Sequence, residues 1–383
     1  MDFALSAEQE LLKKEVRHFL ETECPKKMVR QLEASELGYS PEIWKKMADL
    51  GWLGLVIPEE YGGVNGNLLD LAVLFEEVGR AVFPSPLFST VVFGMLPILE
   101  AGSQEQKKAL LPKVVQGELI LTMALTEPEA DYQPEFLKTR ALRKQDGFTI
   151  NGTKLFVHNA HIADRLLVVS RTGRASANGN GFTVFLVSRE TKGIGLVPLI
   201  TAMGDKQSEV VFQNVSASSR DVLGGVGAGW PLVESTLRKA TAIQCVQTVG
   251  VMQGALAMTA DYTSKRIQFG RPIGSFQAVQ HRLADMLTDV EGARWTSYQA
   301  VSLLGKGLPA AREVAIAKAW TSDACQRVAY AAQHLHGGIG MDMEYDLHFY
   351  FRWAKAMELN LGVAPYHRLS IGPTIMDDLI GSA

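Results

Sequence analysis

The amino-acid sequence predicts an α+β multidomain protein, with an N-terminal α-helical domain, a middle antiparallel β-barrel or sandwich and a C-terminal four-helix bundle. Two observations lead to this fold class. A chain of 383 residues is long enough for roughly two or three domains. Apolar residues recur every three or four positions in its first and last thirds, whereas short β-rich runs separated by Gly, Asn and Ser fill the segment between them. We therefore expect domains at residues 1–120, 121–222 and 223–383.

The N-terminal third carries the signals of helices. Apolar side chains between residues 11 and 20 form one stripe, and Ser6 with Gln9 three positions later is a capping-box pattern ahead of it. Ser40 followed by Pro41 starts a further helix, because Ser caps a first turn and Pro fits its first position. These signals predict an all-helical first domain.

The middle segment carries the sequence signals of strands and turns. Residues 147–156 place short apolar runs on either side of Asn151-Gly152, which is a strong signal for a hairpin turn. Gly, Asn and Ser separate three further β-rich runs, at residues 166–169, 182–187 and 210–212. An antiparallel barrel or sandwich of roughly 90 residues fits this pattern.

Helical spacing returns in the C-terminal part. Apolar residues repeat at three and four positions in Val279, Leu283, Met286, Leu287 and Val290. An Ala-rich segment follows, and helices of this length and apolarity usually pack as a bundle. Residues 225–229 superficially resemble a dinucleotide-binding loop, but they lack the Gly-x-Gly-x-x-Gly spacing between a strand and a helix. We therefore interpret them as a linker between the β segment and the bundle.

The composition narrows the class of protein. Lys and Arg number 38 against 41 Asp and Glu, and this net charge of -3 excludes a strongly basic nucleic-acid binder. Cys24, Cys245 and Cys325 are too few and too scattered for a disulfide framework or a zinc site. The N-terminus lacks a signal-peptide pattern, and the longest apolar stretch, residues 91–99, is far shorter than the roughly 20 residues that span a bilayer. We expect a cytoplasmic protein that binds no nucleic acid and has no membrane span.

Two short motifs leave their function open when they are taken alone. Residues 266–272 form a basic, glycine-containing break between two helical runs; arginines suit phosphate oxygens, although a solvated loop between helices is the commoner case. Gly337-Gly338 either permits close approach of the backbone to a ligand or another chain, or simply ends a helix. The nearby His334 and His336 have no third ligand in sequence, so no metal site is expected.

Taken together and in this order, four segments resemble the acyl-CoA dehydrogenase family over nearly the whole chain. Residues 51–63 resemble its N-terminal Pro-Glu-Glu-Tyr-Gly-Gly signature, and residues 125–128 resemble the start of its flavin-contacting strand. The remaining matches are to its Arg-x-x-Phe-Gly…Gln segment and its Gly-Gly-x-Gly loop, at Arg266, Phe269, Gly270, Gln277 and residues 336–340.

This resemblance implies FAD-dependent α,β-dehydrogenation of an acyl-CoA thioester by a dimer or tetramer, with FAD bound at a dimer interface. One chain supplies the β-domain wall that holds the isoalloxazine ring, and its neighbour supplies the segments that hold the adenine and pyrophosphate end. An electron-transferring flavoprotein is the implied electron acceptor. The implied cofactor-binding residues are Leu125, Thr126, Arg266, Phe269, Gln277, Gly337 and Gly338.

The chain departs from the family at the catalytic base. The reaction needs a carboxylate that removes the α-proton while the β-hydrogen leaves as hydride to the flavin. In most members this Glu follows the Gly-Gly loop, where this chain has Leu361. In a minority it lies on the first bundle helix, where this chain has Ala240. Neither side chain accepts a proton, so no catalytic residue is assigned to this chain.

The half-site that faces the flavin differs from the family as well. Family members follow Leu-Thr-Glu-Pro with Gly-Ser-Asp, whereas residues 129–133 read Glu-Ala-Asp-Tyr-Gln here. The usual Trp-Ile-Thr strand, whose Thr bonds the flavin ring, reads Phe-Val-His at residues 156–158. Tyr132 and His158 therefore add bulk where the ring should lie. The segments that contact the FAD of the neighbouring chain match the family better, except at His334, where Gln is usual.

This asymmetry favours a base-lacking subunit of a hetero-oligomeric dehydrogenase, such as a heterotetramer, that completes the FAD site of a homologous catalytic partner. Such assemblies in the family handle bulky or unusual CoA esters, including steroid side-chain and dicarboxylic acids, and residues 341–342 and 365–368 resemble their base-lacking subunits. A self-sufficient dehydrogenase is an alternative; its candidate bases, Glu234, Asp131 and Glu358, are also typical of solvated surface acids. A further alternative is a binding or scaffold protein that has kept the fold and lost the chemistry.

Overall fold

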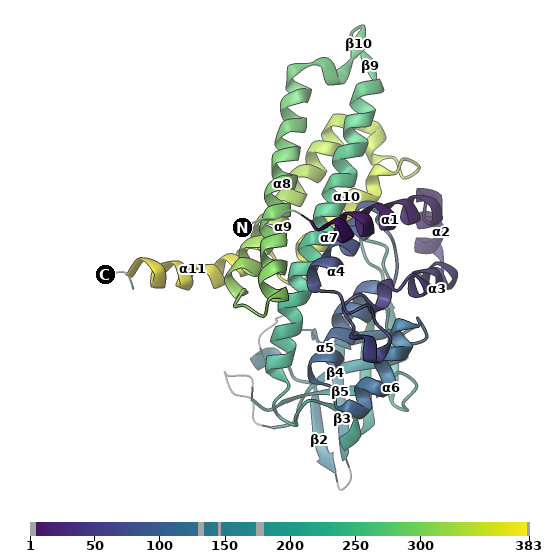
Figure 1. Cartoon of the computed structure of the whole chain (residues 1–383), viewed down its shortest axis with the longest axis vertical. Helices are drawn as coiled ribbons and strands as arrows, with labels where there is room; N and C mark the ends of the chain where they lie inside the picture. Colours follow the sequence, from purple (N-terminus) through teal and green to yellow (C-terminus); the bar gives the residue numbers. More distant parts are fainter. Residues whose placement is uncertain (1–4, 129–133, 145–146, 174–179, 381–383) are drawn as a thin grey trace. The chain divides into compact units, whose positions relative to one another are not determined.

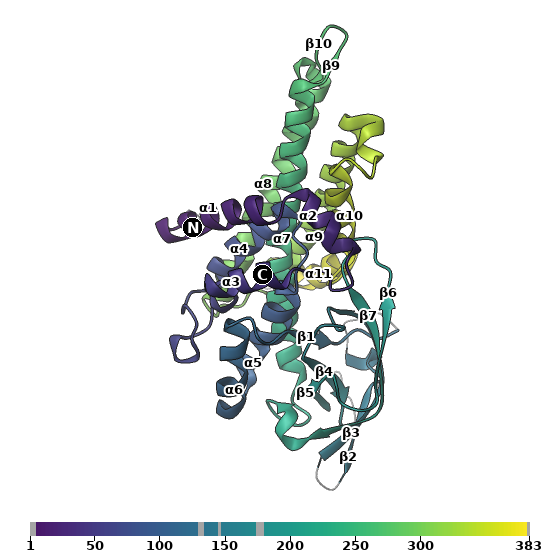
Figure 2. The same cartoon turned by 90° about the vertical axis from the view of Figure 1, so that its right-hand side faces the viewer.

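The computed structural model describes residues 5–128, 134–144, 147–173 and 180–380. The chain forms two compact units, each assembled from separate stretches of sequence. The first unit comprises Met1–Arg30, Asn67–Phe83 and Arg238–Ala383, and the second comprises Gln31–Gly66 and Pro84–Leu237. These stretches can be followed by colour along the chain in Figures 1 and 2.

The second unit contains short helices whose ends follow the sequence signals. Helix α3 (Pro41–Asp49) starts where it was predicted, because the Ser40 side chain accepts a hydrogen bond from the N–H of Ile43 and Pro41 takes the first position. The other helices here are α2 (Lys26–Ala34), which begins in the first unit, a π-helix (Phe88–Met95), α5 (Leu96–Ala101) and α6 (Gln104–Val115).

One mixed sheet forms much of the second unit (Figure 2). Its strands are β1 (Leu121–Ala124), β2 (Arg140–Lys144), β3 (Gly147–His158), β4 (Arg165–Arg171), β5 (Phe182–Ser188), β6 (Ile194–Leu199), β7 (Gln207–Ser218) and β8 (Val222–Leu223). They pair in the order β6-β7-β3-β2-β4-β5-β8, with β1 parallel to β4 and most other pairs antiparallel. The expected middle β domain is therefore present. Its two end strands do not pair with each other among the described residues, so a closed barrel is not found.

The hairpin predicted at Asn151-Gly152 is wrong, because both residues lie inside β3. The register of β3 against β7 shifts between Ile150 and Gly152, which marks a β-bulge. A Cβ at Gly152 would lie 2.4 Å from Oγ1 of Thr139. Glycine at this position therefore serves the close approach of neighbouring backbone rather than a turn.

Long helices build the first unit. Helix α1 (Ala7–Glu23) begins at the predicted capping box, in which Ser6 Oγ accepts from the N–H of Gln9 and the Gln9 side chain accepts from the N–H of Ser6. The other elements are α4 (Leu68–Ala81), α7 (Trp230–Lys265), which begins in the second unit, the strands β9 (Ile267–Gln268) and β10 (Arg271–Pro272), α8 (Gln277–Gly305), α9 (Ala311–His336), α10 (Leu347–Leu359) and α11 (Ala364–Ile380). The expected C-terminal helical domain is present, and none of the described helices has the length and apolarity to cross a membrane.

Helices α4 and α7 touch through their backbones. A Cβ at Gly79 on α4 would lie 1.9 Å from the carbonyl oxygen of Gln247, and one at Gly250 on α7 would lie 1.8 Å from that of Glu76. No side chain fits into contacts this short, so both positions require glycine. The two glycines thereby bring the N-terminal helix α4 directly against the C-terminal helices.

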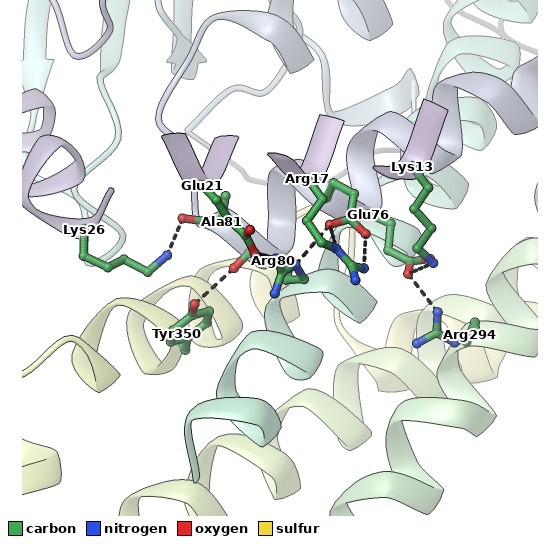
Figure 3. A network of polar contacts seen from close by, with 10 residues as sticks. Lys13, Arg17, Glu21, Lys26, Glu76, Arg80, Ala81, Arg294 and Tyr350 are labelled. Atoms are coloured by element: carbon green, nitrogen blue, oxygen red, sulfur yellow. Dashed lines mark hydrogen bonds and ion pairs between the residues drawn. The ribbon is translucent and has the colours of Figure 1, made fainter. Parts of the chain in front are cut away.

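A buried network of charges joins α1, α4 and α8 (Figure 3). Glu76 is fully buried and pairs with Lys13 at 2.9 Å and with Arg294 at 2.8 Å. Burial alone would raise the pKa of this carboxyl group, but the two cations outweigh burial and hold the pKa below its ordinary value. The neighbouring Glu77 pairs with Arg17 at 2.7 Å. Because loss of one partner would leave a buried charge uncompensated, the network ties the three helices together.

Candidate functional site

Leu125 and Thr126, the predicted flavin contacts of the second unit, directly follow β1 and lie against β3. The carbonyl oxygen of Leu125 accepts a hydrogen bond from Lys154 Nζ at 2.9 Å. The carbonyl oxygen of Thr126 accepts one from the N–H of Leu155 at 2.8 Å. The fold therefore brings these two residues next to residues 156–158, the other stretch that the resemblance places at the flavin ring.

A buried ion pair holds this segment. Lys154 Nζ lies 2.7 Å from Glu127 Oε1, and both side chains are at most 4% exposed. Glu127 also accepts hydrogen bonds from the backbone N–H groups of Lys138 and Thr139. Burial lowers the pKa of Lys154 to about 8, and the Glu127 carboxylate opposes this shift. With both charges paired and hydrogen-bonded, the pair fixes the backbone of residues 125–127.

The end of β3 presents an aromatic side chain at the surface of the second unit. Phe156 is 50% exposed and has a φ of +55°, a left-handed conformation that is rare for a bulky residue. The register of β3 against β7 shifts between Lys154 and Val157, and Val157 is buried while Phe156 is not. Backbone strain of this kind clusters at binding sites. Phe156 thus offers a face on which a flat ring can stack.

His158, the last residue of β3, is held by a carboxylate. Its Nδ1 lies 3.1 Å from Asp205 Oδ2, and its ring stacks on Phe93 of the π-helix. Asp205 also accepts hydrogen bonds from the side chains of Thr201 and Gln207, each at 2.7 Å. Burial alone would raise the pKa of Asp205, but these hydrogen bonds, with that from His158 first, lower it. The imidazole is therefore fixed at a position where the family resemblance expects the smaller Thr.

Arg266 and Phe269 lie at the turn between α7 and α8 in the first unit. Figure 1 shows this turn, with β9 and β10, at the far end of the two helices. Arg266 is exposed and its N–H donates to the carbonyl oxygen of Tyr262 in the last turn of α7. Phe269 is 92% exposed, and its ring lies edge-on to Phe276 at 6.1 Å. Gln277, also exposed, is the first residue of α8. The structure therefore gathers three predicted FAD contacts on one exposed turn, which suits contact with a ligand or another chain.

Gly337 and Gly338 follow α9 directly. Gly337 has a φ of +65° and a ψ of −142°, a conformation that is essentially restricted to glycine. A Cβ at either residue would meet no atom within 4 Å, so the surface over this loop is open. The Tyr262 hydroxyl lies 3.4 Å from the carbonyl oxygen of His336, and the two rings stack at 4.4 Å. The loop thus lies beside the end of α7 that leads to Arg266.

A cavity of about 780 Å³ adjoins this loop. Its lining residues come from α8, α9 and the loop: Arg282, Asp285, Met286, Asp289, Gln326, Arg327, Tyr330, Ala331, Gln333, His334, Gly337, Gly338 and Met341. Oε1 of Gln333 is buried, and no hydrogen-bond partner for it is found among the residues that the structure describes. A volume of this size, lined by charged, aromatic and glycine residues, is typical of a site for a cofactor-sized ligand.

The two positions at which a catalytic base is expected carry apolar side chains. Ala240 on α7 is fully buried. Leu361, between α10 and α11, is buried with a φ of +58°, and its carbonyl oxygen accepts a hydrogen bond from His367 Nε2 at 2.8 Å. Lys318 on α9 donates to the carbonyl oxygen of Met357 in the last turn of α10. The backbone at Leu361 is therefore well anchored, but its side chain cannot accept a proton.

The alternative bases do not stand out as catalytic groups. Glu234 is exposed and accepts a hydrogen bond from Trp230 Nε1 at 3.0 Å. Glu358 pairs with Lys355 at 2.5 Å. Asp131, with its neighbours in the predicted flavin-facing stretch, lies outside the described residues. Each of the two described carboxylates thus has a partner on its own helix, as ordinary surface acids do.

Sequence reasoning missed the groups that hold the site in place. Lys154 and Glu127 are 27 positions apart, and His158 and Asp205 are 47 positions apart, so neither pair forms a local motif. A lysine inside the β-rich run of residues 147–156 was the available signal for a buried partner. The cavity beside Gly337 left no comparable signal, because its lining residues come from two helices and the loop that follows the second one.

Comparison with known proteins identifies the family. The models for the N-terminal, middle and C-terminal domains of acyl-CoA dehydrogenase match residues 6–118, 122–215 and 227–376. A probable acyl-CoA dehydrogenase of Bacillus subtilis (strain 168), YngJ, is 31% identical over 381 residues, which cover 98% of this chain and 100% of the relative. The chain belongs to the acyl-CoA dehydrogenase family, whose members act on the CH–CH bond of an acyl-CoA.

Solved structures share the fold along nearly the whole chain. A chain of the ChsE4–ChsE5 complex from Mycobacterium tuberculosis is 30% identical with a TM-score of 0.89, over 98% of this chain and 99% of that one. A chain of the Tcur3481–Tcur3483 steroid ACAD is 34% identical with a TM-score of 0.86, over 97% and 99%. The FAD complex of PigA is 26% identical with a TM-score of 0.89, over 98% and 99%.

FAD is the cofactor of this enzyme family. In the first unit, the open backbone of Gly337 and Gly338 adjoins a cavity in which the buried Oε1 of Gln333 has no hydrogen-bond partner within the described part of the chain. These features fit the adenine and diphosphate end of FAD. The second unit offers the exposed ring of Phe156 as a stacking surface, next to the larger and fixed imidazole of His158. The residues present therefore fit the adenine end better than the ring end.

Proposed function

We propose that this chain is the base-lacking subunit of a hetero-oligomeric, FAD-dependent acyl-CoA dehydrogenase and completes the FAD site of a homologous catalytic partner. The observation that carries the proposal is the pair of apolar side chains, Leu361 and Ala240, at both positions of the base. The ChsE4–ChsE5 complex supports it, because that relative joins two different chains.

The chemistry explains why a partner is needed. Removal of the α-proton of a CoA thioester requires a positioned base whose pKa is raised toward that of the substrate. A bound FAD would supply the acceptor for the β-hydrogen, which leaves as hydride. Leucine and alanine cannot accept a proton, so the proton acceptor comes from the partner in this assembly.

The two units of this chain contribute differently to the proposed assembly. In the first unit, the residues that would hold the adenine and diphosphate end of a FAD shared with the partner are Arg266, Phe269, Gln277, Gly337 and Gly338. In the second unit, the segment at Leu125 and Thr126 is this chain's own flavin wall, altered at its edge by His158. The structure supports this assignment through the open loop and cavity in one unit and the fixed imidazole in the other.

Other features of the assembly follow from the family. We propose a heterotetramer or dimer, an electron-transferring flavoprotein as electron acceptor, and a bulky cyclic or steroid-type acyl-CoA as substrate, the last because a steroid ACAD is a solved relative. The three cysteines are free and buried, which supports a reducing, cytoplasmic compartment. We further propose domain boundaries at residues 1–120, 121–222 and 223–383.

The decisive experiment compares the chain alone with the chain co-expressed with a neighbouring homologue that carries the Glu. Flavin absorbance per chain and acyl-CoA turnover with an artificial electron acceptor are measured for both preparations. We expect poor flavin retention and no turnover for the isolated chain, and about one FAD per pair of chains with turnover for the complex. Full flavin and turnover in the isolated chain would show a self-sufficient enzyme. Absence of flavin from both preparations would show a binding or scaffold protein.

A further inference from the structure

We propose that the side-chain amide of Gln244 on α7 binds a hydroxyl group on the acyl part of an acyl-CoA ligand. Such a ligand lies outside the proposed function, which gives this chain no acyl-CoA of its own. A chain without a catalytic base can hold an acyl-CoA without dehydrogenating it, so the two proposals stand independently of each other.

Gln244 carries a buried side-chain amide in the first unit. The residue is 6% exposed, and its Oε1 is a buried atom for which the described part of the chain offers no hydrogen-bond partner. An amide oxygen that is buried without a hydrogen bond destabilises the folded chain. A bound molecule that donates to this oxygen would remove that cost, so the atom marks a place for a ligand or a water.

A second buried glutamine of the first unit shows how such an amide is ordinarily paired. Gln9 is 8% exposed, and its Oε1 accepts a hydrogen bond from the N–H of Ser6 at 3.0 Å. Its Nε2 donates to Asp70 Oδ1 at 2.8 Å. Both ends of the Gln9 amide therefore serve the packing of helices. Oε1 of Gln244 makes no such bond among the described residues.

The position of Gln244 relates it to the acyl end of a substrate. It follows Ala240 by four residues on α7, so the two side chains leave the same face of the helix, with Cβ atoms about 5–6 Å apart. The Thr248 hydroxyl donates to the carbonyl oxygen of Gln244 at 2.8 Å and lies 3.3 Å from Met357 Sδ. Met357 stands in the last turn of α10, which leads to Leu361. The amide thus belongs to the part of the first unit that carries both expected base positions, where the α-carbon of an acyl-CoA is expected.

The chemistry of the amide decides which acyl group it favours. Oε1 is an acceptor, so the group that it lacks is a hydrogen-bond donor. A hydroxyl group on the acyl chain donates, whereas a carbonyl oxygen or an ionised carboxylate only accepts. An unsubstituted hydrocarbon leaves the oxygen unpaired and keeps it from water. Gln244 therefore favours a hydroxylated acyl group over its unsubstituted counterpart.

Calorimetric titration of the full-length chain with two CoA esters, in buffer that contains FAD, tests this assignment. The probes are cyclohexanecarbonyl-CoA and the same ester with a hydroxyl group on the ring carbon opposite the α-carbon. We expect the hydroxylated ester to bind the wild-type chain roughly tenfold more tightly. Gln244→Met keeps the length of the side chain and removes its polar atoms, so this preference should disappear. The Kd of the unsubstituted ester should stay within about twofold of wild type.

Thermal melts without ligand separate binding from folding. Gln244→Met should melt at the wild-type temperature or above it, because the variant removes an acceptor that is buried without a bond. Gln9→Met is the matched control, since it removes an amide of similar burial whose two ends are bonded. It should melt below wild type and keep the preference for the hydroxylated ester.

Four results would overturn the hydroxyl contact. They are equal affinity of the wild-type chain for the two esters, binding of neither ester, and equal weakening of both esters in Gln244→Met, which would place the amide at coenzyme A instead. The fourth is a lower melting temperature of Gln244→Met with unchanged Kd values, which would assign the amide to an internal water. Each leaves the proposed function standing, because flavin retention and turnover of the co-expressed pair test that function separately.

Discussion

The proposed flavin wall of the second unit and the glycine loop of the first unit are held in place in different ways. The wall depends on side chains, because Lys154 holds Leu125 from within the sheet and Asp205 holds His158 at its edge. The loop depends on backbone, because Gly337 adopts a conformation that essentially only glycine reaches. In the wall, single side chains can be replaced while the strands that carry them stay in place. In the loop, the backbone conformation itself forms the surface, so it is kept as long as the glycines are kept.

Removal of the buried lysine of the wall should have the largest effect on stability. Lys154→Met leaves the carboxylate of Glu127 buried without its cation, and we expect a loss of about 3–5 kcal/mol in the free energy of unfolding, measured by urea denaturation. The double variant Lys154→Met/Glu127→Gln should recover much of this loss. Lys144→Met, on the exposed end of β2, is the control and should stay close to wild type. A single variant no less stable than this control would show that the pair does not hold the wall.

Substitutions at the two glycines of the loop separate the effect of backbone strain on stability from the effect of an added methyl group on FAD binding. Gly337→Ala forces a Cβ into a positive φ and should cost about 1–3 kcal/mol of stability. Gly338→Ala adds a methyl group over the same open surface without that strain. It should leave thermal stability near wild type yet lower FAD retention in the co-purified complex. Equal FAD retention in wild type and Gly338→Ala would argue against the loop as a cofactor contact.

Helix caps allow the stability of the two units to be compared. Ser6→Ala in the first unit and Ser40→Ala in the second each remove one side-chain cap and should cost about 1 kcal/mol. Hydrogen exchange should become faster in α1 for the first variant and in α3 for the second. Faster exchange spread evenly over both units in either variant would show that the units open together rather than separately.

The smallest effect is expected on mild acidification. Burial, followed by the charges of Arg352 and Arg30, lowers the pKa of His348 from 6.5 to about 4. The unfolded chain therefore binds this proton at a higher pH than the folded chain, so stability should fall as the pH decreases from 6.5 towards 4. Thermal melts of wild type and His348→Gln at pH 7 and pH 6 check this. The variant should lose less stability between the two values, and an identical loss would assign the effect to other groups.

The sequence predicted those parts of the fold whose signals are local. The caps at Ser6 and Ser40 lie next to the helices that they start, so no distant partner is needed to find them. The hairpin predicted at Asn151-Gly152 was wrong because this segment forms a bulge in β3, and that bulge depends on pairing with the distant strand β7. Leu11 and Leu287 belong to periodic apolar stripes but are 59% and 51% exposed, since periodicity does not reveal how wide the buried face is.

In the candidate site, only the residues that stand in family motifs could be predicted from the sequence. Arg266 and Gly337 stand in segments that match a family, and their role as FAD contacts stays a prediction until the flavin is measured. Asp205 could not be found in this way, because folding alone brings it to His158 from 47 positions away. The apolar residue at the expected base position was visible in the sequence, since a leucine at position 361 needs no structure to be recognised as unable to accept a proton.

The turn at Leu361 bears on how a proton acceptor can be engineered into this chain. Leu361 already holds the left-handed backbone, and Gly362 follows it at a φ of +92°. A left-handed residue other than glycine costs roughly 1–2 kcal/mol, and this fold already accommodates that cost. Leu361→Glu therefore requires a new side chain but no rebuilt main chain. One substitution at this turn would therefore supply the carboxylate that the proposed role assigns to the partner.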